Sequence, residues 1–263
     1  MFQPVLISSG LTGWQFLQRT YDRQFETFDQ STELQRDTDY FAENIGTITT
    51  AEDLVADRRL LTVALGAFGL EDDINNKFFI QKMLSDGTTA DDALANRFTD
   101  SRYSDLSGSF GLGPGEVRGS LSPNFAQGII AKFHANSFEI ATGAQDDTMR
   151  IALYAERTLP DAMSADSSQA ARWFTIMGQP PLRSMFETAL GLPEAFGQVD
   201  IDQQLSVFQE RSESIFGVSD PAEFADPEVL DAVITAYLAR SQLSSFGAGS
   251  TGASIALTLL RGG

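Results

Sequence analysis

The chain contains 263 residues, 42% of them hydrophobic, and its 36 acidic and 18 basic side chains give a formal net charge of −18. This length suits one large domain or two modest ones. The acidic balance argues against a nucleic-acid partner, whose phosphates require clustered Lys and Arg, and against anionic membrane surfaces. The absence of cysteine excludes disulfides, thiolate nucleophiles and cysteine-based zinc sites.

Neither a membrane span nor a secretory leader is expected. No run of about 18 apolar residues exists, so we predict no membrane insertion. The N-terminal stretch MFQPVLISSGLTGWQFLQRTYDR lacks a basic leader and a long apolar region. The predicted location is therefore the cytoplasm, and export by a route that reads a different signal is the alternative.

Apolar residues recur at helical spacing through the first half of the chain. Residues 1–10 are expected to be extended or mobile. The helices predicted after them cover residues 11–28, 34–45, 50–70, 72–84, 89–98 and 100–110. On the fourth of these helices, the predicted core positions are Ile74, Phe78, Ile80 and Leu84.

The stretch from Thr50 to Leu70 carries the strongest fold signal. Thr50 and Asp53 fit a capping box, in which a hydroxyl and a carboxylate satisfy the free N–H groups at a helix start. Gly69 is placed to adopt the left-handed conformation that ends a helix. The apolar residues that share one face are Leu54, Leu61, Leu65 and Phe68. We therefore predict one helix deep in a core, with neighbours on two sides.

A segment rich in Gly and Pro over residues 111–123, GLGPGEVRGSLSP, must be a loop and is the one candidate domain boundary. We expect a helical half over 1–112, a second over 122–243, and a flexible tail with a short terminal helix over 244–263, or else a single domain overall. The helices predicted beyond the loop cover residues 125–140, 146–157, 168–177, 181–191, 202–215 and 226–243. Alternating strands are absent, so the predicted fold class is an all-α multi-helix bundle.

A short internal echo suggests that the two halves are pseudo-repeats. Ala64-Leu65-Gly66 recurs as Ala189-Leu190-Gly191. An ancient duplication would produce two similar helical halves. Chance recurrence of helix-end chemistry is the alternative.

The patterns that could support catalysis are weak. His134 is the only histidine, so any catalytic triad or histidine general base depends on it. Ile130 and Phe138 lie four residues to either side, which favours a packed structural histidine. The G-x-G-x-x-G match from Gly247 to Gly252 has no preceding strand and has Ala253 where a phosphate-binding lysine would stand. We interpret it as a flexible hinge.

Paired carboxylates occur at Asp72-Asp73, Asp91-Asp92 and Asp146-Asp147. Each pair lies near a predicted helix start, where a negative charge is favoured by about 0.3–1 kcal/mol. Capping therefore explains these pairs better than metal binding or catalysis. We predict no catalytic residue, no metal site and no cofactor.

An aromatic segment near the N-terminus provides the candidate interaction residues Trp14, Phe16 and Leu17. Tryptophan is enriched at the energetic centres of protein interfaces, so this segment is suited to docking on a partner. Packing of the same residues on the chain's own core is the favoured alternative.

The stretch from Gly13 to Phe110 resembles a bacterial, alphaproteobacterial-type family of unknown function whose genes lie among flagellar genes. The strings that carry the resemblance are Gly13-Trp14, Arg36-Asp37, Tyr40-Phe41, Ala51–Leu54, Asp57–Leu61, Ala67–Leu70, Asn76–Phe79, Leu94–Arg97 and Asp100–Tyr103. A weaker likeness extends over Phe138-Glu139 and 147–153. The residues taken as the structural core of the motif are Leu54, Asp57, Arg58, Leu61, Leu65, Phe68 and Gly69. Asp57, Arg58 and Arg59 are expected in the middle of a helix, as a structural ion pair.

Some members of that family carry labels as flagellar basal-body or rod-related proteins. True rod and hook proteins pair terminal heptad helices around a β-rich middle, and this chain lacks strands. The resemblance therefore implies an accessory or assembly role with a flagellar protein partner. Two alternatives stay open, an enzyme or small-ligand binder with a cavity between helices, and a secreted structural subunit of the flagellum. The oligomeric state is not predicted.

Overall fold

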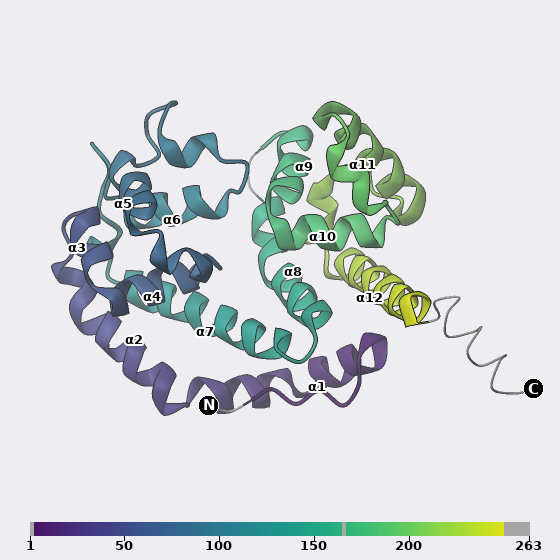
Figure 1. Cartoon of the computed structure of the whole chain (residues 1–263), viewed down its shortest axis with the longest axis horizontal. Coiled ribbons are helices and arrows are strands. Elements are labelled where there is room, and N and C mark those ends of the chain that lie inside the picture. The colour runs from purple at the N-terminus through teal and green to yellow at the C-terminus, as the bar shows by residue number, and fades with distance from the viewer. Residues whose placement is uncertain (1–2, 165–166, 250–263) are drawn as a thin grey trace, which may run out of the picture. The chain divides into compact units, whose positions relative to one another are not determined.

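The structure, a computed structural model, describes residues 3–164 and 167–249 (Figure 1). Across these residues the chain forms twelve α-helices and six short 3₁₀ helices, with no strand among them, so the predicted all-α fold class is confirmed. The described residues divide into two compact units. Unit 1 holds residues 3–5, 20–145 and 178–180, and unit 2 holds residues 6–19, 146–164, 167–177 and 181–249.

Helix α1 (Gly10–Asp29) contributes residues to both units. The other α-helices of unit 1 are α2 (Thr32–Asn44), α3 (Ala51–Ala56), α4 (Arg58–Ala67), α5 (Lys77–Asp86), α6 (Arg102–Phe110) and α7 (Phe125–Gly143). Its 3₁₀ helices are η1 (Ile45–Thr47), η2 (Glu71–Asn75), η3 (Leu94–Arg97) and η4 (Gly119–Leu121). The prediction of a helix over 89–98 was therefore wrong except for the short η3.

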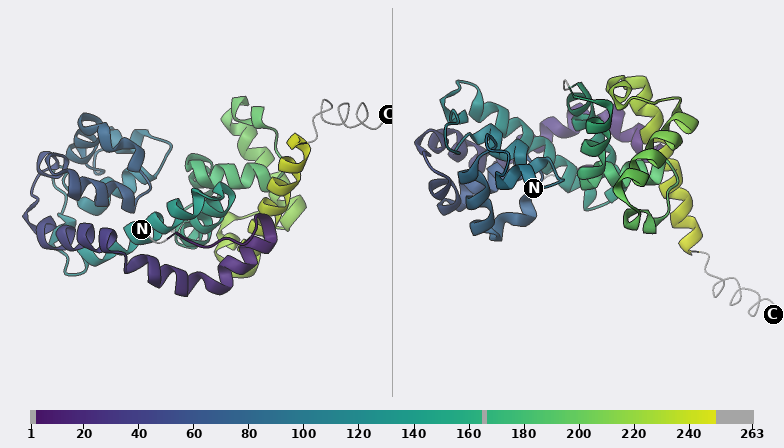
Figure 2. Two further views of the ribbon diagram at one scale, coloured as in Figure 1. Left: turned by 60° about the horizontal axis from the view of Figure 1, so that its bottom comes forward. Right: turned by 90° about the horizontal axis from the view of Figure 1, so that it is seen from above.

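The helices of unit 2 are α8 (Asp147–Ser164), α9 (Gln169–Gly178), α10 (Pro180–Ala189), η5 (Glu194–Gln198), α11 (Ile201–Phe216), η6 (Pro221–Ala225) and α12 (Pro227–Gly249). The core of this unit contains Trp173, whose indole makes edge-to-face contacts with Phe186, Phe208 and Phe224 at centroid distances of 5.8–6.1 Å. Two further views show these helices from other directions (Figure 2). Helix α12 continues through Gly249, so residues 244–249 of the predicted tail are helical; residues 250–263 lie outside the described part.

The predicted central helix is two helices. The capping box is present, because the Thr50 hydroxyl accepts from the Asp53 N–H and the Asp53 carboxylate accepts from the Thr50 N–H. Helix α3 then ends after Ala56, Asp57 takes an extended conformation, and α4 begins at Arg58. The mid-helix placement of Asp57 was therefore wrong.

Helix α4 is the buried centre of unit 1, as the sequence predicts. It packs against α2, α3 and α7, and its apolar side chains are buried. At its end, Gly69 has a φ of 69°, the Leu70 N–H donates to the Leu65 carbonyl at 3.0 Å, and the Gly69 N–H donates to the Gly66 carbonyl. This is a Schellman end, and the predicted left-handed glycine is confirmed.

The echoed Ala-Leu-Gly strings differ in structure. Gly66 lies inside α4, whereas Gly191 has a φ of 67° and follows the end of α10. Around Gly191 the Leu192 N–H donates to the Glu187 carbonyl at 2.8 Å, the same bond that Leu70 makes after α4. The same helix end therefore occurs at Gly69 and Gly191, whereas the sequence repeat pairs Gly191 with Gly66, three residues earlier.

The glycine-rich segment over 111–123 belongs to unit 1 and does not separate the two units. Glu116 anchors it, because its carboxylate accepts from the Thr88 N–H at 2.6 Å and from the Gly113 N–H at 3.1 Å. These bonds hold the segment against the end of α5. The units therefore do not divide at the boundary expected from composition.

Candidate functional site

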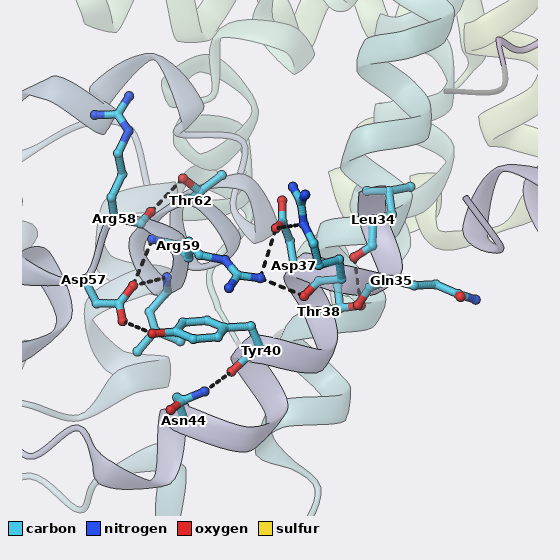
Figure 3. Close-up of polar contacts among 12 residues, drawn as sticks. Leu34, Gln35, Asp37, Thr38, Tyr40, Asn44, Asp57, Arg58, Arg59 and Thr62 are labelled. Carbon is cyan, nitrogen blue, oxygen red and sulfur yellow. Dashed lines mark hydrogen bonds and ion pairs between the residues drawn. The ribbon is translucent and has the colours of Figure 1, made fainter. Parts of the chain in front are cut away.

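The break between α3 and α4 is the centre of a polar network (Figure 3). One Asp57 carboxylate oxygen accepts hydrogen bonds from the backbone N–H groups of Arg59 and Leu60, at 2.9 and 3.1 Å. The other accepts the Tyr40 hydroxyl at 2.7 Å. Asp57 is therefore the N-cap of α4 and also ties that helix to α2.

The pKa values of Asp57 and Tyr40 are shifted away from the range that acid–base catalysis needs. Burial raises the pKa of Asp57, but the hydrogen bonds from Tyr40, Leu60 and Arg59 more than offset it, so the pKa lies below its ordinary value. The pKa of Tyr40 is raised, chiefly by its hydrogen bond to Asp57. A general acid or base needs a pKa near the working pH. Asp57 therefore stays ionised and Tyr40 stays protonated near neutral pH, which suits a structural hydrogen bond.

The two arginines that follow Asp57 differ in their surroundings. The Arg59 guanidinium lies 3.9 Å from the centre of the Tyr40 ring and donates to the Arg36 carbonyl at 2.9 Å and to Asp37 at 3.3 Å. The Arg58 side chain is exposed and points away from this network, as Figure 3 shows. Arg58 is therefore not part of the core, contrary to its expected place in the motif.

We expect Asp57→Ala to destabilise the protein by about 0.5–2 kcal/mol, because α4 loses its N-cap. Asp57→Asn should cost less, since Asn also caps helices. The folded state lowers the pKa of Asp57, so its contribution is present above the pKa of the unfolded chain and is lost as the pH falls through the folded-state value. Urea unfolding at several pH values measures this; equal losses for the Ala and Asn variants would contradict it.

A second network joins the start of α6 to the end of α4. Arg102 donates from Nε to the Asp100 carboxylate at 3.0 and 3.1 Å, from Nη2 to it at 2.6 Å, and from Nη1 to the Gly69 carbonyl at 2.5 Å. Next to it, the Tyr103 hydroxyl donates to Asp73 at 2.7 Å. Burial, and then this hydrogen bond, raise the pKa of Tyr103. These contacts fix η2 and α6 against the Schellman end of α4.

Beside this network lies a set of aromatic rings that we call the α5 aromatic surface: Phe78, Phe79, Phe98 and Tyr103. Phe79, Phe98 and Tyr103 are in mutual contact, with ring centroids 5.3–5.5 Å apart. Phe78 is 83% exposed and Phe98 is 40% exposed. The prediction that Phe78 is a core residue was therefore wrong. An aromatic side chain exposed to this degree is suited to a partner interface.

His134 lies on α7 and its Nδ1 contacts the carboxylate of Asp29, the last residue of α1. Burial lowers the pKa of His134, and Asp29 opposes that shift. Its Nε2 is buried without a hydrogen-bond partner among the described residues. Such an enclosed imidazole fits the structural interpretation made from the sequence.

The remaining predicted residues have ordinary surroundings. Trp14 and Leu17 are buried and Phe16 is partly buried, so a docking role for this segment would require α1 to leave its neighbours. Asp146 caps α8 by accepting from the Thr148 N–H, and Asp73 accepts from Asn76. Within residues 3–164 and 167–249, no group of His, Asp and Glu is arranged to hold a metal ion. The match from Gly247 to Gly252 lies partly outside the described residues.

The comparison with protein families decides the identity. Residues 67–230, more than half of the chain, match the family described as "Protein of unknown function (DUF1217)". The chain belongs to the DUF1217 family. The sequence resemblance to a family of unknown function is thus confirmed, and its flagellar part is not addressed by this match. No curated protein matches the chain.

The fold of this DUF1217 member is similar to a solved structure. The crystal structure of protein AGR_C_984 from Agrobacterium tumefaciens superposes with a TM-score of 0.75 at 24% sequence identity, covering 92% of this chain and 97% of that one. That likeness shows the shared fold. In the described parts of this DUF1217 chain, no helix has the combination of length and hydrophobicity needed to cross a bilayer.

The structure separates the strings that carry the resemblance into two groups. Some make internal contacts in unit 1: Asp37, Tyr40, Asp57, Arg59, Gly69, Phe79, Asp100, Arg102 and Tyr103. Others are exposed and make no ion pair among the described residues: Arg58, Phe78 and Arg97. The sequence analysis did not identify Phe78 as a surface residue. The available signal was that Phe78 and Phe79 are consecutive, and consecutive residues on a helix point in different directions.

Proposed function

We propose that this DUF1217 protein is non-enzymatic and acts by protein–protein contact, as a cytoplasmic accessory factor in assembly or function of the bacterial flagellum. The proposed contact site is the α5 aromatic surface. The flagellar assignment rests on the resemblance to proteins of flagellar gene clusters. Association with the basal body after export is the alternative location.

The exposure of Phe78 is the observation that carries this proposal. Ten phenylalanines of the described residues are buried, yet the ring of Phe78 is 83% exposed. The next residue on α5, Phe79, contacts the rings of Phe98 and Tyr103, so the helix that carries Phe78 is tied to the neighbouring segments. A rigid surface with a protruding aromatic ring loses little entropy on binding, which favours its use as an anchor.

The networks around Asp57 and Arg102 support a non-enzymatic role. Their charged groups bind one another and the backbone, and the pKa shifts of Asp57, Tyr40 and Tyr103 move them away from neutrality. Groups used in acid–base catalysis usually have pKa values shifted toward neutrality. The Asp57 network ties α4 to α2, and the Arg102 and Tyr103 contacts hold α6 against η2 and the end of α4.

The test is crosslinking in motile cells of the bacterium that encodes the chain, followed by purification of a tagged copy and mass spectrometry. We expect flagellar export or basal-body components to be enriched with the wild-type chain and to fall at least about tenfold with Phe78→Ala, the loss typical of an interface anchor. Since Phe78 is exposed, its truncation should leave the fold intact.

The matched control is Leu243→Ala, which truncates an apolar side chain of 70% exposure in unit 2. This variant should retain the wild-type partners. Equal recovery of partners with Phe78→Ala and with wild type would refute the assigned surface. Recovery of the chain alone, from cells that still swim when the gene is deleted, would refute the flagellar role.

A further inference from the structure

We infer that Gln24 and Gln145 form a site that binds an extended, uncharged, proline-containing segment of a partner protein by its main chain. Residues 3–5 of the chain itself occupy this site in the structure, so they compete with that partner. All of these residues belong to unit 1 and none to the α5 aromatic surface. The inference therefore stands apart from the proposed function and does not depend on it.

The side-chain amide of Gln24, on α1, binds both main-chain groups of one residue. Its Oε1 accepts from the Val5 N–H at 2.5 Å, and its Nε2 donates to the Val5 carbonyl at 3.2 Å. Residues paired in neighbouring strands exchange two bonds of this kind, so Val5 presents its main chain as an extended residue does. Residues 3–5 accordingly lie alongside α1 (Figure 1).

The Gln24 amide is fixed before any segment binds. Its Nε2 also donates to the Thr20 hydroxyl at 2.7 Å, one turn earlier on the same helix, which sets the orientation of the amide. The Gln24 side chain is only 7% exposed. A buried amide costs free energy unless its donors and acceptor are bonded. When residues 3–5 leave, an extended main chain satisfies the vacated donor and acceptor together, with the same geometry.

The second contact comes from Gln145, which follows α7. Its Nε2 donates to the Pro4 carbonyl at 2.5 Å. Pro4 is buried, whereas Gln3 is exposed and Val5 is 50% exposed. The site thus binds the main chain of two residues and encloses the side chain of one. Proline suits the enclosed position, because it has no N–H to satisfy and its ring restricts the backbone to a φ compatible with an extended chain.

The segment that occupies the site buries little apolar surface. Val5 and Ile7 are 50% and 59% exposed, so these two side chains gain little of the free energy that full burial would give. Segments with few buried apolar contacts open locally at low free energy. A partner segment can therefore replace residues 3–5 without unfolding the helices of unit 1.

The charge of the segment defines the ligand class further. The first charged side chain in the sequence is Arg19, although 21% of the whole chain is charged. A neutral segment approaches a chain of net charge −18 without repulsion, and the bonds to the two glutamines require no charge. The ligand class is therefore neutral, and its binding should change less than about twofold when the salt concentration is raised.

The test is an NMR titration of the ¹⁵N-labelled full chain with a blocked peptide of residues 3–8, Gln-Pro-Val-Leu-Ile-Ser. The side-chain amide signals of Gln24 and Gln145 report binding at the site, and each is assigned by its absence in the corresponding alanine variant. Pro4→Glu weakens the internal occupant, because burial of a carboxylate is costly. We expect the peptide to bind the Pro4→Glu chain at least about tenfold tighter than wild type, whose site is free for only a small fraction of the time.

Variants in the Pro4→Glu background locate the binding. Gln145 is exposed, so Gln145→Ala should keep the fold and weaken the peptide by about two- to tenfold, the loss expected of one hydrogen bond. The matched control is Gln18→Ala, which removes an exposed glutamine of the same helix α1 whose Nε2 binds Glu156 at 2.8 Å. This control should leave the peptide affinity unchanged. A peptide with Glu in place of its proline should not bind.

Four results would overturn the inference. The first is the absence of shifts at the Gln24 and Gln145 amides of the Pro4→Glu chain up to about 5 mM peptide, above the millimolar effective concentration of a short tether. The second is equal affinity of wild type and Pro4→Glu, and the third is an equal effect of Gln145→Ala and Gln18→Ala. The fourth is a concentration-dependent wild-type dimer in sedimentation that Gln145→Ala abolishes, because it would identify a second copy as the source of the segment.

Discussion

Arg102→Ala will lower the free energy of unfolding by about 1–3 kcal/mol, the cost of leaving the hydrogen-bond partners of a partly buried charged side chain unsatisfied. The Arg102 and Asp100 side chains are only 17% and 15% exposed, so the remaining carboxylate cannot recover full hydration. The Gly69 carbonyl also loses the donor that binds it at 2.5 Å, at the point where α4 ends. Urea unfolding followed by far-UV circular dichroism measures the change.

Two further arginine variants make this prediction specific. Arg102→Lys keeps the charge but cannot reproduce the fork of donors that reaches both Asp100 and Gly69, so we expect an intermediate loss. Arg97→Ala removes an exposed arginine without a described ion pair and should change stability by no more than about 0.5 kcal/mol. A similar effect of Arg97→Ala and Arg102→Ala would show that the network does not support the fold.

Arg102 and Asp57 show how far the sequence determines these networks. Both fall within strings that carry the family resemblance, so their importance was foreseeable. Their partners were not, because Arg102 reaches Gly69 across 33 residues and Tyr40 reaches Asp57 across 17. Spacing along one helix reports which residues share a face, but it does not report which helices meet.

The errors in the helix predictions have a common physical cause. Leu54 and Leu61 stay in phase across the break at Asp57, so periodicity alone does not reveal that the backbone leaves the helical conformation there. Ile74 and Phe78 are four residues apart, yet η2 ends at Asn75 and α5 begins at Lys77. The helical periodicity is interrupted between Ile74 and Phe78, so the two side chains need not share a face, and Phe78 is exposed. Capping residues such as Asp57 were the available signal for such a reset.

The contact between α4 and α7 leads to the final prediction, in which one substitution has opposite effects at two glycines. A Cβ added at Gly66 would lie 2.7 and 2.8 Å from two ring carbons of Phe133 on α7, closer than carbon atoms can approach. We expect Gly66→Ala to destabilise the protein by about 1–3 kcal/mol, because the gain in helix propensity does not offset the overpacking.

Gly128 provides the matched case. It lies within α7, and a Cβ added there would meet nothing within 4 Å, so Gly128→Ala should stabilise the protein by about 0.5–1 kcal/mol through helix propensity alone. The cause of the Gly66 effect is tested with Phe133→Leu, which shortens the opposing side chain. If the clash is responsible, Gly66→Ala must cost less in the Phe133→Leu background, and the two changes will be non-additive. Additive losses would mean that α4 and α7 do not meet as closely as the glycine at position 66 indicates.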